Sequence, residues 1–405
     1  MLGEYTMGKK NKKEQKGPQT PVEQKKALKK KRRKRKLIML VVEVILLLIV
    51  LAALYVVNTL NKIQKAPTLE PEELHINEDI SEETQELLKG FEDVAIFGVD
   101  NRSNGNTDSG NSDVIMVASI NNDTKEVRLI SVYRDTFLDS DAGLDSSPNF
   151  HKANRAYAKG GAEQAVRMLN ANLDLDIRHY MTVDFAAVTK VIDLLGGVEV
   201  EVDSAELKWI NGYINTTGQV TGKPSSYLSA PGTYTLDGTQ ATAYCRIRYT
   251  AGNDYARAER QREVLTQIVK KAKSCDISTI NKIINEVLPD VSTNYTNMQI
   301  LTMASSMLSY ELVGTAGYPF SKYGASLGGS KGDVVIPADA VSNVRALHRY
   351  LYDDNTYVPS ATVTNYSSLV EQTYGPTFDK GDNPEAVTGS GVIEEDDFDG
   401  DGSSE

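Results

Sequence analysis

The sequence has few residues of the kinds that bind metals through nitrogen or sulfur. Its 405 residues include two cysteines and four histidines. Cys245 and Cys275 lie far apart, and neither the cysteines nor the histidines show the spacing of a zinc site. Outside a cell the two cysteines could form a disulfide, but Cys245 falls in an expected buried strand, which favours two free buried thiols.

Two motifs of common enzyme classes are also absent, and a third lacks its structural context. The chain has no H-E-x-x-H metalloprotease motif and no Walker loop. Its one G-x-S-x-G match, at 324–328, is not followed by the helical pattern that a nucleophile elbow requires. The glycine-rich segment 328–332 lacks both the Walker pattern and a preceding strand. These absences argue against hydrolases with a classical triad, zinc peptidases and enzymes driven by nucleotide hydrolysis.

Basic residues are concentrated at the amino terminus. Residues 1–36 contain fifteen Lys and Arg and three Glu, a net charge of +12, whereas the rest of the chain has 29 basic and 52 acidic residues, a net of −23. A basic segment can bind nucleic acid, but the apolar sequence that follows favours a cytoplasmic tail attracted to anionic lipid. We therefore expect a membrane partner and no nucleic acid.

An apolar run of twenty-one residues, 37–57, follows directly and has Glu43 as its one charged residue. A helix of that length rises about 31 Å, enough to cross the hydrocarbon core of a bilayer. The run and the basic block are both longer than those of a cleaved signal peptide. We predict a single transmembrane helix in the cell membrane, with a cytoplasmic amino terminus and an extracytoplasmic folded domain.

The chain beyond this run divides by composition. We predict an extracytoplasmic stalk at 58–90, a folded domain at 91–275, a helical and mixed extension at 276–378 and an acidic, disordered tail at 379–405.

Short apolar runs alternate with amphipathic helical patterns, which predicts an α/β fold, a layered α-β-α domain with a central mixed sheet. The expected strands are 94–99, 114–120, 127–132, 179–183, 198–202 and 334–336. The expected helices are 162–173, 185–195, 276–287, 297–310 and 338–352. Residues 206–231, rich in Gly, Ser and Thr, are predicted to form a long loop that contains Trp209, Tyr213 and Tyr227.

Five arginines fall within seventeen residues of this otherwise acidic domain. Arginine binds phosphate through a planar, permanently charged fork of N–H donors. In the expected strand 244–249 successive side chains alternate, so Arg246 and Arg248 point to one face. The helix expected next has Arg257 and Gln261 on its inward face. These four side chains are predicted to converge on one anion near the start of that helix.

The alternative is a network of salt bridges with local acidic residues. Partners at helical spacing exist for Arg260 and Arg262, which we therefore predict to lie at the surface. Two arginines that alternate along an apolar strand are not explained in this way, so a phosphate site is favoured for the inner set.

Charged residues also collect at the ends of the predicted strands. Asp100 and Arg102 follow the first strand, Asp113 precedes the second, and Arg134 and Asp135 follow the third. Aspartate oxygens are typical Mg²⁺ ligands beside a substrate phosphate, although a single loop aspartate often only caps a turn. A metal ion combined with arginines is typical of phosphoryl-transfer sites.

In order and spacing, these residues resemble the LytR-CpsA-Psr family of cell-envelope phosphotransferases over roughly residues 90–270. The segments that carry the resemblance are 98–102, 112–113, 131–135, 152–157, 160–161, 193–198, 236–238, 246–248, Asp254, Arg257 and 260–262. The chain departs from the family pattern at Asn111, Tyr133 and Ala153, which replace an arginine, a proline and an isoleucine.

The resemblance implies a membrane-anchored enzyme that takes a glycopolymer from a polyprenyl-pyrophosphate carrier and transfers it, through its phosphate, to peptidoglycan. It implies that Asp100 and Asp113 hold Mg²⁺, with Mn²⁺ as a substitute. The catalytic candidates are Arg134, Asp135, Arg246 and Arg248, and the pyrophosphate-binding candidates are Arg102, Lys152, Arg257 and Gln261. The general base is left open between Asp135 and an acceptor activated by the metal.

Two other functions fit the same residues. The domain could bind lipid-linked pyrophosphate without turnover, as an attachment protein, or it could be a regulatory protein. The predicted membrane helix separates the basic tail from the charged site, which argues against transcriptional regulation through that tail.

Overall fold

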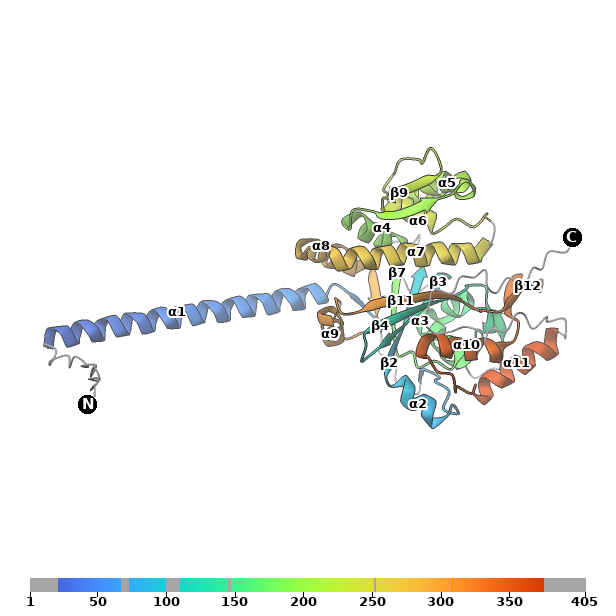
Figure 1. Cartoon of the computed structure of the whole chain (residues 1–405), viewed down its shortest axis with the longest axis horizontal. Helices are drawn as coiled ribbons and strands as arrows, with labels where there is room; N and C mark the ends of the chain where they lie inside the picture. The colour runs from blue at the N-terminus through green and yellow to red at the C-terminus, as the bar shows by residue number, and fades with distance from the viewer. Residues whose placement is uncertain are drawn as a thin grey trace, which may run out of the picture. The chain divides into compact units, whose positions relative to one another are not determined.

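The computed structural model describes residues 21–66, 73–99, 110–144, 147–250, 253–306 and 308–374. It divides into two compact units, Met1–Asn58 and Thr59–Glu405. The described part of the first unit, residues 21–58, lies in the long helix α1 (Pro21–Leu60) (Figure 1). The predicted acidic tail and most of the predicted basic tail lie outside the described residues.

The predicted membrane segment is only partly described. The side chains of residues 37, 38, 40–44 and 52 lie outside the description. Within the described residues, no helix combines the length and the apolar character that crossing a bilayer requires.

The second unit is built on a seven-stranded mixed sheet, with strand order β1-β10-β7-β2-β3-β4-β11. Its strands are β1 (Gln64–Lys65), β2 (Phe91–Val99), β3 (Ser112–Asn121), β4 (Glu126–Val132), β7 (His179–Asp184), β10 (Val291–Thr293) and β11 (Glu311–Tyr318). β3 pairs antiparallel with both β2 and β4, whereas β7 pairs parallel with β2 and β11 parallel with β4. The predicted α/β class with a mixed sheet is confirmed.

Helices cover both faces of this sheet (Figure 1). On one face α3 (Asn154–Leu173) and α10 (Ala340–Tyr352) close the larger core, which includes Phe97, Ile130 and Leu169. On the other face α7 (Asn253–Ser274) packs Leu265 against Met116 and Leu129 of the sheet. The domain therefore has the predicted α-β-α layers.

A second core lies on the side of α7 that faces away from the sheet. It is formed by α4 (Phe185–Leu194), β8 (Val198–Val202), α5 (Ser204–Thr221), β9 (Gly232–Leu236) and α6 (Gly238–Tyr244). Ile192, Val200 and Ile210 are fully buried there, and Val264 of α7 joins them. Helix α7 is thus buried from two sides.

The remaining elements surround these layers. They are α2 (Glu82–Leu88), β5 (Phe137–Asp139), β6 (Phe150–Lys152), α8 (Ile277–Val287), η2 (Leu288–Asp290), α9 (Asn297–Ser306), β12 (Lys322–Ser326), β13 (Asp333–Pro337) and α11 (Ala361–Tyr374).

The structure places the predicted stalk and the predicted extension within the same folded unit as the domain between them. β1 pairs with β10, and Leu74 and Ile80 are buried in the larger core. β11 and α10 supply an edge strand of the sheet and part of that core. The fold begins before residue 91 and continues past residue 275 because these segments cover apolar surface that the intervening chain alone would leave open to water.

Two local predictions are wrong. Residues 204–221, expected within a loop, form helix α5, which starts with a capping box between Asp203 and Glu206. Residues 244–249, expected as a strand, contain the end of helix α6 and a tight turn. Helix α6 also begins with a capping box, from Asp237 and Gln240, and it uses residues that would otherwise start the strand. Both cysteines are free thiols.

Candidate active site

Arg246 and Arg248 reach the site from the turn that follows helix α6. The backbone carbonyl of Ile247, between them, accepts a hydrogen bond of 2.7 Å from Arg260 of α7. Arg246 donates to the hydroxyl of Thr217 on α5 at 2.9 Å, and its guanidinium lies 5.2 Å from the ring of Phe185. The turn is therefore fixed by contacts with three different helices.

Asp113, at the start of β3, meets three arginines. Its Oδ1 lies 2.8 Å from Nη1 of Arg134, and its Oδ2 lies 3.4 Å from Nη2 of Arg248. Its backbone carbonyl accepts a hydrogen bond of 3.3 Å from Arg257. One aspartate from the sheet thus links arginines that are as far as 144 residues away in the sequence.

Asp254, in the first turn of α7, forms a second centre of the cluster. Its Oδ1 lies 3.2 Å from Arg257, 3.6 Å from Arg134 and 3.9 Å from Arg248. Asp254 is not among the site residues predicted from the sequence, although it is one of the residues that carry the family resemblance. The usable signal was its spacing of three residues from Arg257 at a helix start, where a carboxylate is favoured.

Asp135 and Lys152 extend the cluster along the neighbouring hairpin. The two oxygens of Asp135 face different cations, Lys152 at 3.0 Å and Arg134 at 3.3 Å. Lys152 lies on β6 and pairs with Phe137, the first residue of β5, which starts two residues after Asp135. The structure therefore brings Arg134, Asp135 and Lys152 together as one ion-pair network.

A cavity of about 170 Å³ opens beside this network. Its lining contains five of the predicted residues, Asp113, Arg246, Arg248, Arg257 and Gln261. Gln261 donates a hydrogen bond of 3.2 Å to the carbonyl of Cys245, so its amide is anchored at the cavity wall. The rest of the lining consists of Tyr213, Cys245 and Tyr249.

Burial and charge set the protonation states in the cavity. Burial alone would raise the pKa of Asp113, but the charges of Arg257, Arg134 and Arg248 outweigh it and hold that pKa below its usual range. Burial, reinforced by the charge of Arg134, lowers the pKa of Arg257 to about 10. At neutral pH both groups are charged, so the cavity presents fixed cations to a ligand.

The lowered pKa of Asp113 predicts a pH-dependent effect of the substitution Asp113→Asn. A carboxyl group with a depressed folded-state pKa contributes stability above its unfolded pKa of about 4 and loses that contribution as pH falls through the folded value. We expect the difference in unfolding free energy between wild type and variant to be largest near pH 7 and to shrink below about pH 4.

Urea unfolding at several pH values measures this difference. Asp123→Asn, in the exposed turn between β3 and β4, is the matched control and should show a small difference throughout. A difference for Asp113→Asn that stays constant with pH would contradict the assignment of Asp113 as an ionised member of the cluster.

Arg260 and Arg262 do not lie at the surface as predicted. Their exposed fractions are 5% and 6%. Arg260 forms an ion pair of 3.3 Å with the buried Glu206 and lies 5.8 Å from the ring of Tyr244. Because α7 is covered on two sides, a residue that points away from the sheet still points into a core.

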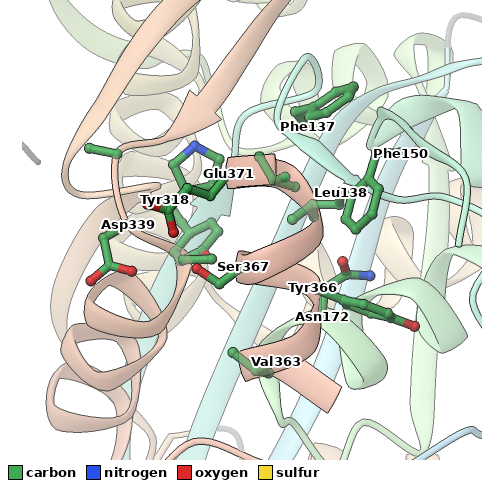
Figure 2. Close-up of a pocket in the computed structure, with 14 residues that line it drawn as sticks. Phe137, Leu138, Phe150, Asn172, Tyr318, Asp339, Val363, Tyr366, Ser367 and Glu371 are labelled. Atoms are coloured by element: carbon green, nitrogen blue, oxygen red, sulfur yellow. The ribbon is translucent and has the colours of Figure 1, made fainter. Parts of the chain in front are cut away.

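A larger cavity, of about 220 Å³, lies elsewhere, between helix α11, the start of α10 and strands β5 and β6 (Figure 2). Phe137, Phe150 and Tyr366 give it an aromatic wall, and Asp339 and Glu371 contribute carboxylates. No arginine or lysine is among the described residues that line it. This cavity lacks the positive charge that a phosphate ligand needs, so the smaller cavity is the candidate site.

The remaining predicted residues, Asp100 and Arg102, lie outside the described residues. Among those described, no group of three or more histidine, cysteine, aspartate or glutamate side chains is arranged to hold a metal ion. The two-aspartate metal site therefore stays a prediction, and Asp113 is the one of its two predicted ligands that the structure describes.

Comparison with known proteins gives consistent matches for this chain. The model of the LytR_cpsA_psr family matches residues 52–325, more than half of the sequence. A polyisoprenyl-teichoic acid–peptidoglycan teichoic acid transferase TagU of Enterococcus faecalis is 32% identical over 203 residues, 50% of this chain and 60% of the relative. The biofilm regulatory protein A of Streptococcus mutans is 31% identical over 208 residues, 50% of this chain and 49% of the relative.

These matches span about half to three fifths of the length of the two relatives. Among solved structures, a Streptococcus agalactiae protein superposes with a TM-score of 0.56 at 23% identity and covers 73% of this chain and 97% of its own. At that identity the superposition bears on the fold, and it agrees with the mixed sheet and helical layers described above.

Proposed function

This chain belongs to the LytR_cpsA_psr family, and we propose that it is a membrane-anchored phosphotransferase that moves a glycopolymer from a polyprenyl-pyrophosphate carrier onto peptidoglycan. The cavity lined by Arg246, Arg248 and Arg257 carries this proposal, because it gathers permanently charged donors around a space of about 170 Å³. The name of the Enterococcus faecalis relative, a teichoic acid transferase with peptidoglycan in its reaction, supports the donor and acceptor classes.

The charge of the cluster also suits a pyrophosphate diester. Its described members include five cations, Arg134, Lys152, Arg246, Arg248 and Arg257, and three carboxylates, Asp113, Asp135 and Asp254. The difference is a net charge of +2, which matches a ligand with about two negative charges. Such a ligand compensates the cluster without leaving a buried charge unpaired.

The proposed reaction forms one phosphorus–oxygen bond and breaks another. A hydroxyl oxygen of peptidoglycan attacks the phosphorus that carries the glycopolymer. The bond from that phosphorus to the bridging oxygen breaks, polyprenyl phosphate leaves, and the proton of the hydroxyl passes to solvent. Charge accumulates on the phosphoryl oxygens and the leaving phosphate, so fixed guanidinium groups lower the barrier by stabilising that charge.

We assign different roles to the residues of the cluster. Arg246, Arg248 and Arg257 bind the pyrophosphate directly, since they line the cavity. Asp254 holds the guanidinium groups in place through its contacts at 3.2–3.9 Å. Asp135 is a positioning residue rather than a general base in this proposal, because each of its oxygens already faces a cation.

The residues present are compatible with a magnesium ion, although only one predicted ligand is described. Asp113 is ionised, and its Oδ2 is only loosely engaged by Arg248 at 3.4 Å. We propose that Asp113, with Asp100, holds Mg²⁺ or Mn²⁺. A bound divalent ion would supply further neutralisation of the pyrophosphate charge.

We also propose that α1 anchors the protein in the cell membrane, with the basic segment in the cytoplasm and the active site outside. Seven consecutive apolar side chains, from residue 45 to residue 51, are each about half exposed or more. Apolar surface of this extent suits contact with lipid. An alkaline wash of the membrane fraction, without detergent, should leave the full chain in the membrane pellet. Release of the full chain into the supernatant would contradict this placement.

The test of function uses the full chain in detergent micelles with a polyprenyl-pyrophosphoryl oligosaccharide, Mg²⁺ and peptidoglycan. We expect release of polyprenyl phosphate together with covalent attachment of the saccharide to peptidoglycan, and loss of both products with a chelator. Tight binding of the lipid without formation of either product would indicate a binding or attachment protein rather than an enzyme. Absence of both binding and turnover would contradict the site itself.

A further inference from the structure

Aromatic side chains line one side of the arginine cavity and continue out to the surface. Tyr213 and Tyr249 are part of its lining, beside Arg246 and Arg248. Tyr249 is 64% exposed, so its ring lies at the mouth rather than in the interior. The ring of Trp209 lies 5.0 Å from that of Tyr249 at an angle of 44°. Aromatic rings that continue the lining of a cavity to its mouth are placed to contact a ligand that extends out of that cavity.

The surrounding structure holds these rings in place. Trp209 and Tyr213 are four residues apart on α5 and therefore lie on the same face of that helix. Both pack in part against the second core. Tyr213 also lies 5.9 Å from the guanidinium of Arg246, and Lys208 lies 5.3 Å from the ring of Trp209. The arginines and the aromatic rings thus form one continuous surface.

We propose that Tyr249 and Trp209 form a platform for the saccharide that is attached to the donor pyrophosphate. The proposal rests on the pyrophosphate assignment of the cavity, because the first sugar is bonded to the phosphate and must leave the cavity through its mouth. A pyranose ring presents a face of C–H bonds that packs on the electron-rich face of an aromatic ring. The Tyr249 hydroxyl and the Lys208 ammonium can donate hydrogen bonds to the sugar hydroxyls.

A saccharide fits this surface better than a lipid tail does. Lys208 places a charge beside the rings, 5.3 Å from the ring of Trp209. A polyprenyl chain would have to desolvate that charge, whereas a sugar keeps it hydrated or hydrogen-bonded. The platform therefore serves substrate recognition: the arginines bind the phosphates, and the rings bind the sugar that is bonded to the phosphate.

The test compares two ligands on the full chain in detergent micelles, polyprenyl pyrophosphate and the same lipid bearing a disaccharide. We expect Tyr249→Ala to weaken binding of the disaccharide form by about 3- to 10-fold, the size of one aromatic packing contact, and to leave the sugar-free form within about 2-fold. Trp209→Phe keeps an aromatic ring and should have a smaller effect. Tyr227→Ala is the matched control, since Tyr227 is 62% exposed and lies outside the described lining of the cavity.

Each alternative outcome contradicts the proposal. Equal losses of affinity for the two ligands would show that Tyr249 contacts the pyrophosphate or the lipid. A loss of affinity no larger than that of Tyr227→Ala would show that Tyr249 does not contact the ligand. If Tyr249→Ala weakens binding of a soluble peptidoglycan fragment but not of the lipid-linked disaccharide, the platform serves the acceptor. If wild type binds neither lipid, the proposed function fails together with the platform. If wild type binds both lipids and Tyr249→Ala has no selective effect, only the platform fails.

Discussion

Replacing Arg248 by alanine is expected to weaken binding of polyprenyl pyrophosphate by about 10- to 100-fold, because a charge-assisted hydrogen bond contributes about 1.5–3 kcal/mol. Arg248 is more exposed than Arg134, Lys152 and Arg257: its side chain is 37% exposed, against 17%, 25% and 5%. Its nearest carboxylate oxygens lie 3.4 Å and 3.9 Å away. A ligand phosphate can therefore replace weak internal contacts with strong ones. Isothermal titration with the sugar-free lipid measures the loss.

The same substitution should change folding stability by less than about 1 kcal/mol, since ion pairs of a partly exposed side chain contribute little. Arg248→Lys keeps the charge but loses the planar fork, so we expect it to recover only part of the affinity. Arg178→Ala, which removes an exposed arginine paired with Asp176 away from the cavity, is the matched control. Wild-type affinity in Arg248→Ala would show that the ligand does not contact this guanidinium.

Replacing Arg260 by methionine is expected to lower the free energy of unfolding by about 3–5 kcal/mol, because it leaves Glu206 as an uncompensated buried charge. Arg260 is 5% exposed and Glu206 is 8% exposed. The substitution also removes the hydrogen bond to the carbonyl of Ile247, which fixes the turn between Arg246 and Arg248. Ligand affinity should therefore fall together with stability. Urea unfolding measures the first effect and lipid titration the second.

A double-mutant cycle separates the ion pair from simple packing. Glu206→Gln combined with Arg260→Met leaves no unpaired charge and should recover part of the lost stability. Lys190→Met breaks a half-buried pair with Asp290 and should cost less than about 1 kcal/mol. If Arg260→Met is no more destabilising than Lys190→Met, Arg260 is not the buried support that the structure indicates.

The strands were predicted well from short apolar runs in the sequence. The hairpin of β3 and β4 and the strand β8 appear where those runs placed them. Prediction failed for a helix that is covered on two sides. Helix α7 packs Leu265 on the sheet and Val264 on the second core, so one inward stripe describes it incompletely, and Arg260 was assigned to the wrong environment.

Local capping signals explain the other errors. The alternation around Arg246 and Arg248 suggested a strand, but the capping box of Asp237 and Gln240 starts a helix a few residues earlier. Glycines within 204–221 suggested a loop, although that segment begins with its own capping box. Convergence of Arg248 and Arg257 on Asp113 depends on contacts across more than a hundred residues, which no local pattern contains.

The parallel pairing of β11 with β4 limits where this chain can be truncated without exposing its sheet. A chain that ended at residue 275 would lose β11 and leave the edge of β4 that faces away from β3 unpaired. It would also uncover the apolar surface that Leu347 and Tyr350 of α10 close. Such a fragment would offer an unprotected sheet edge to other copies and would tend to aggregate, although it would retain every arginine of the cavity.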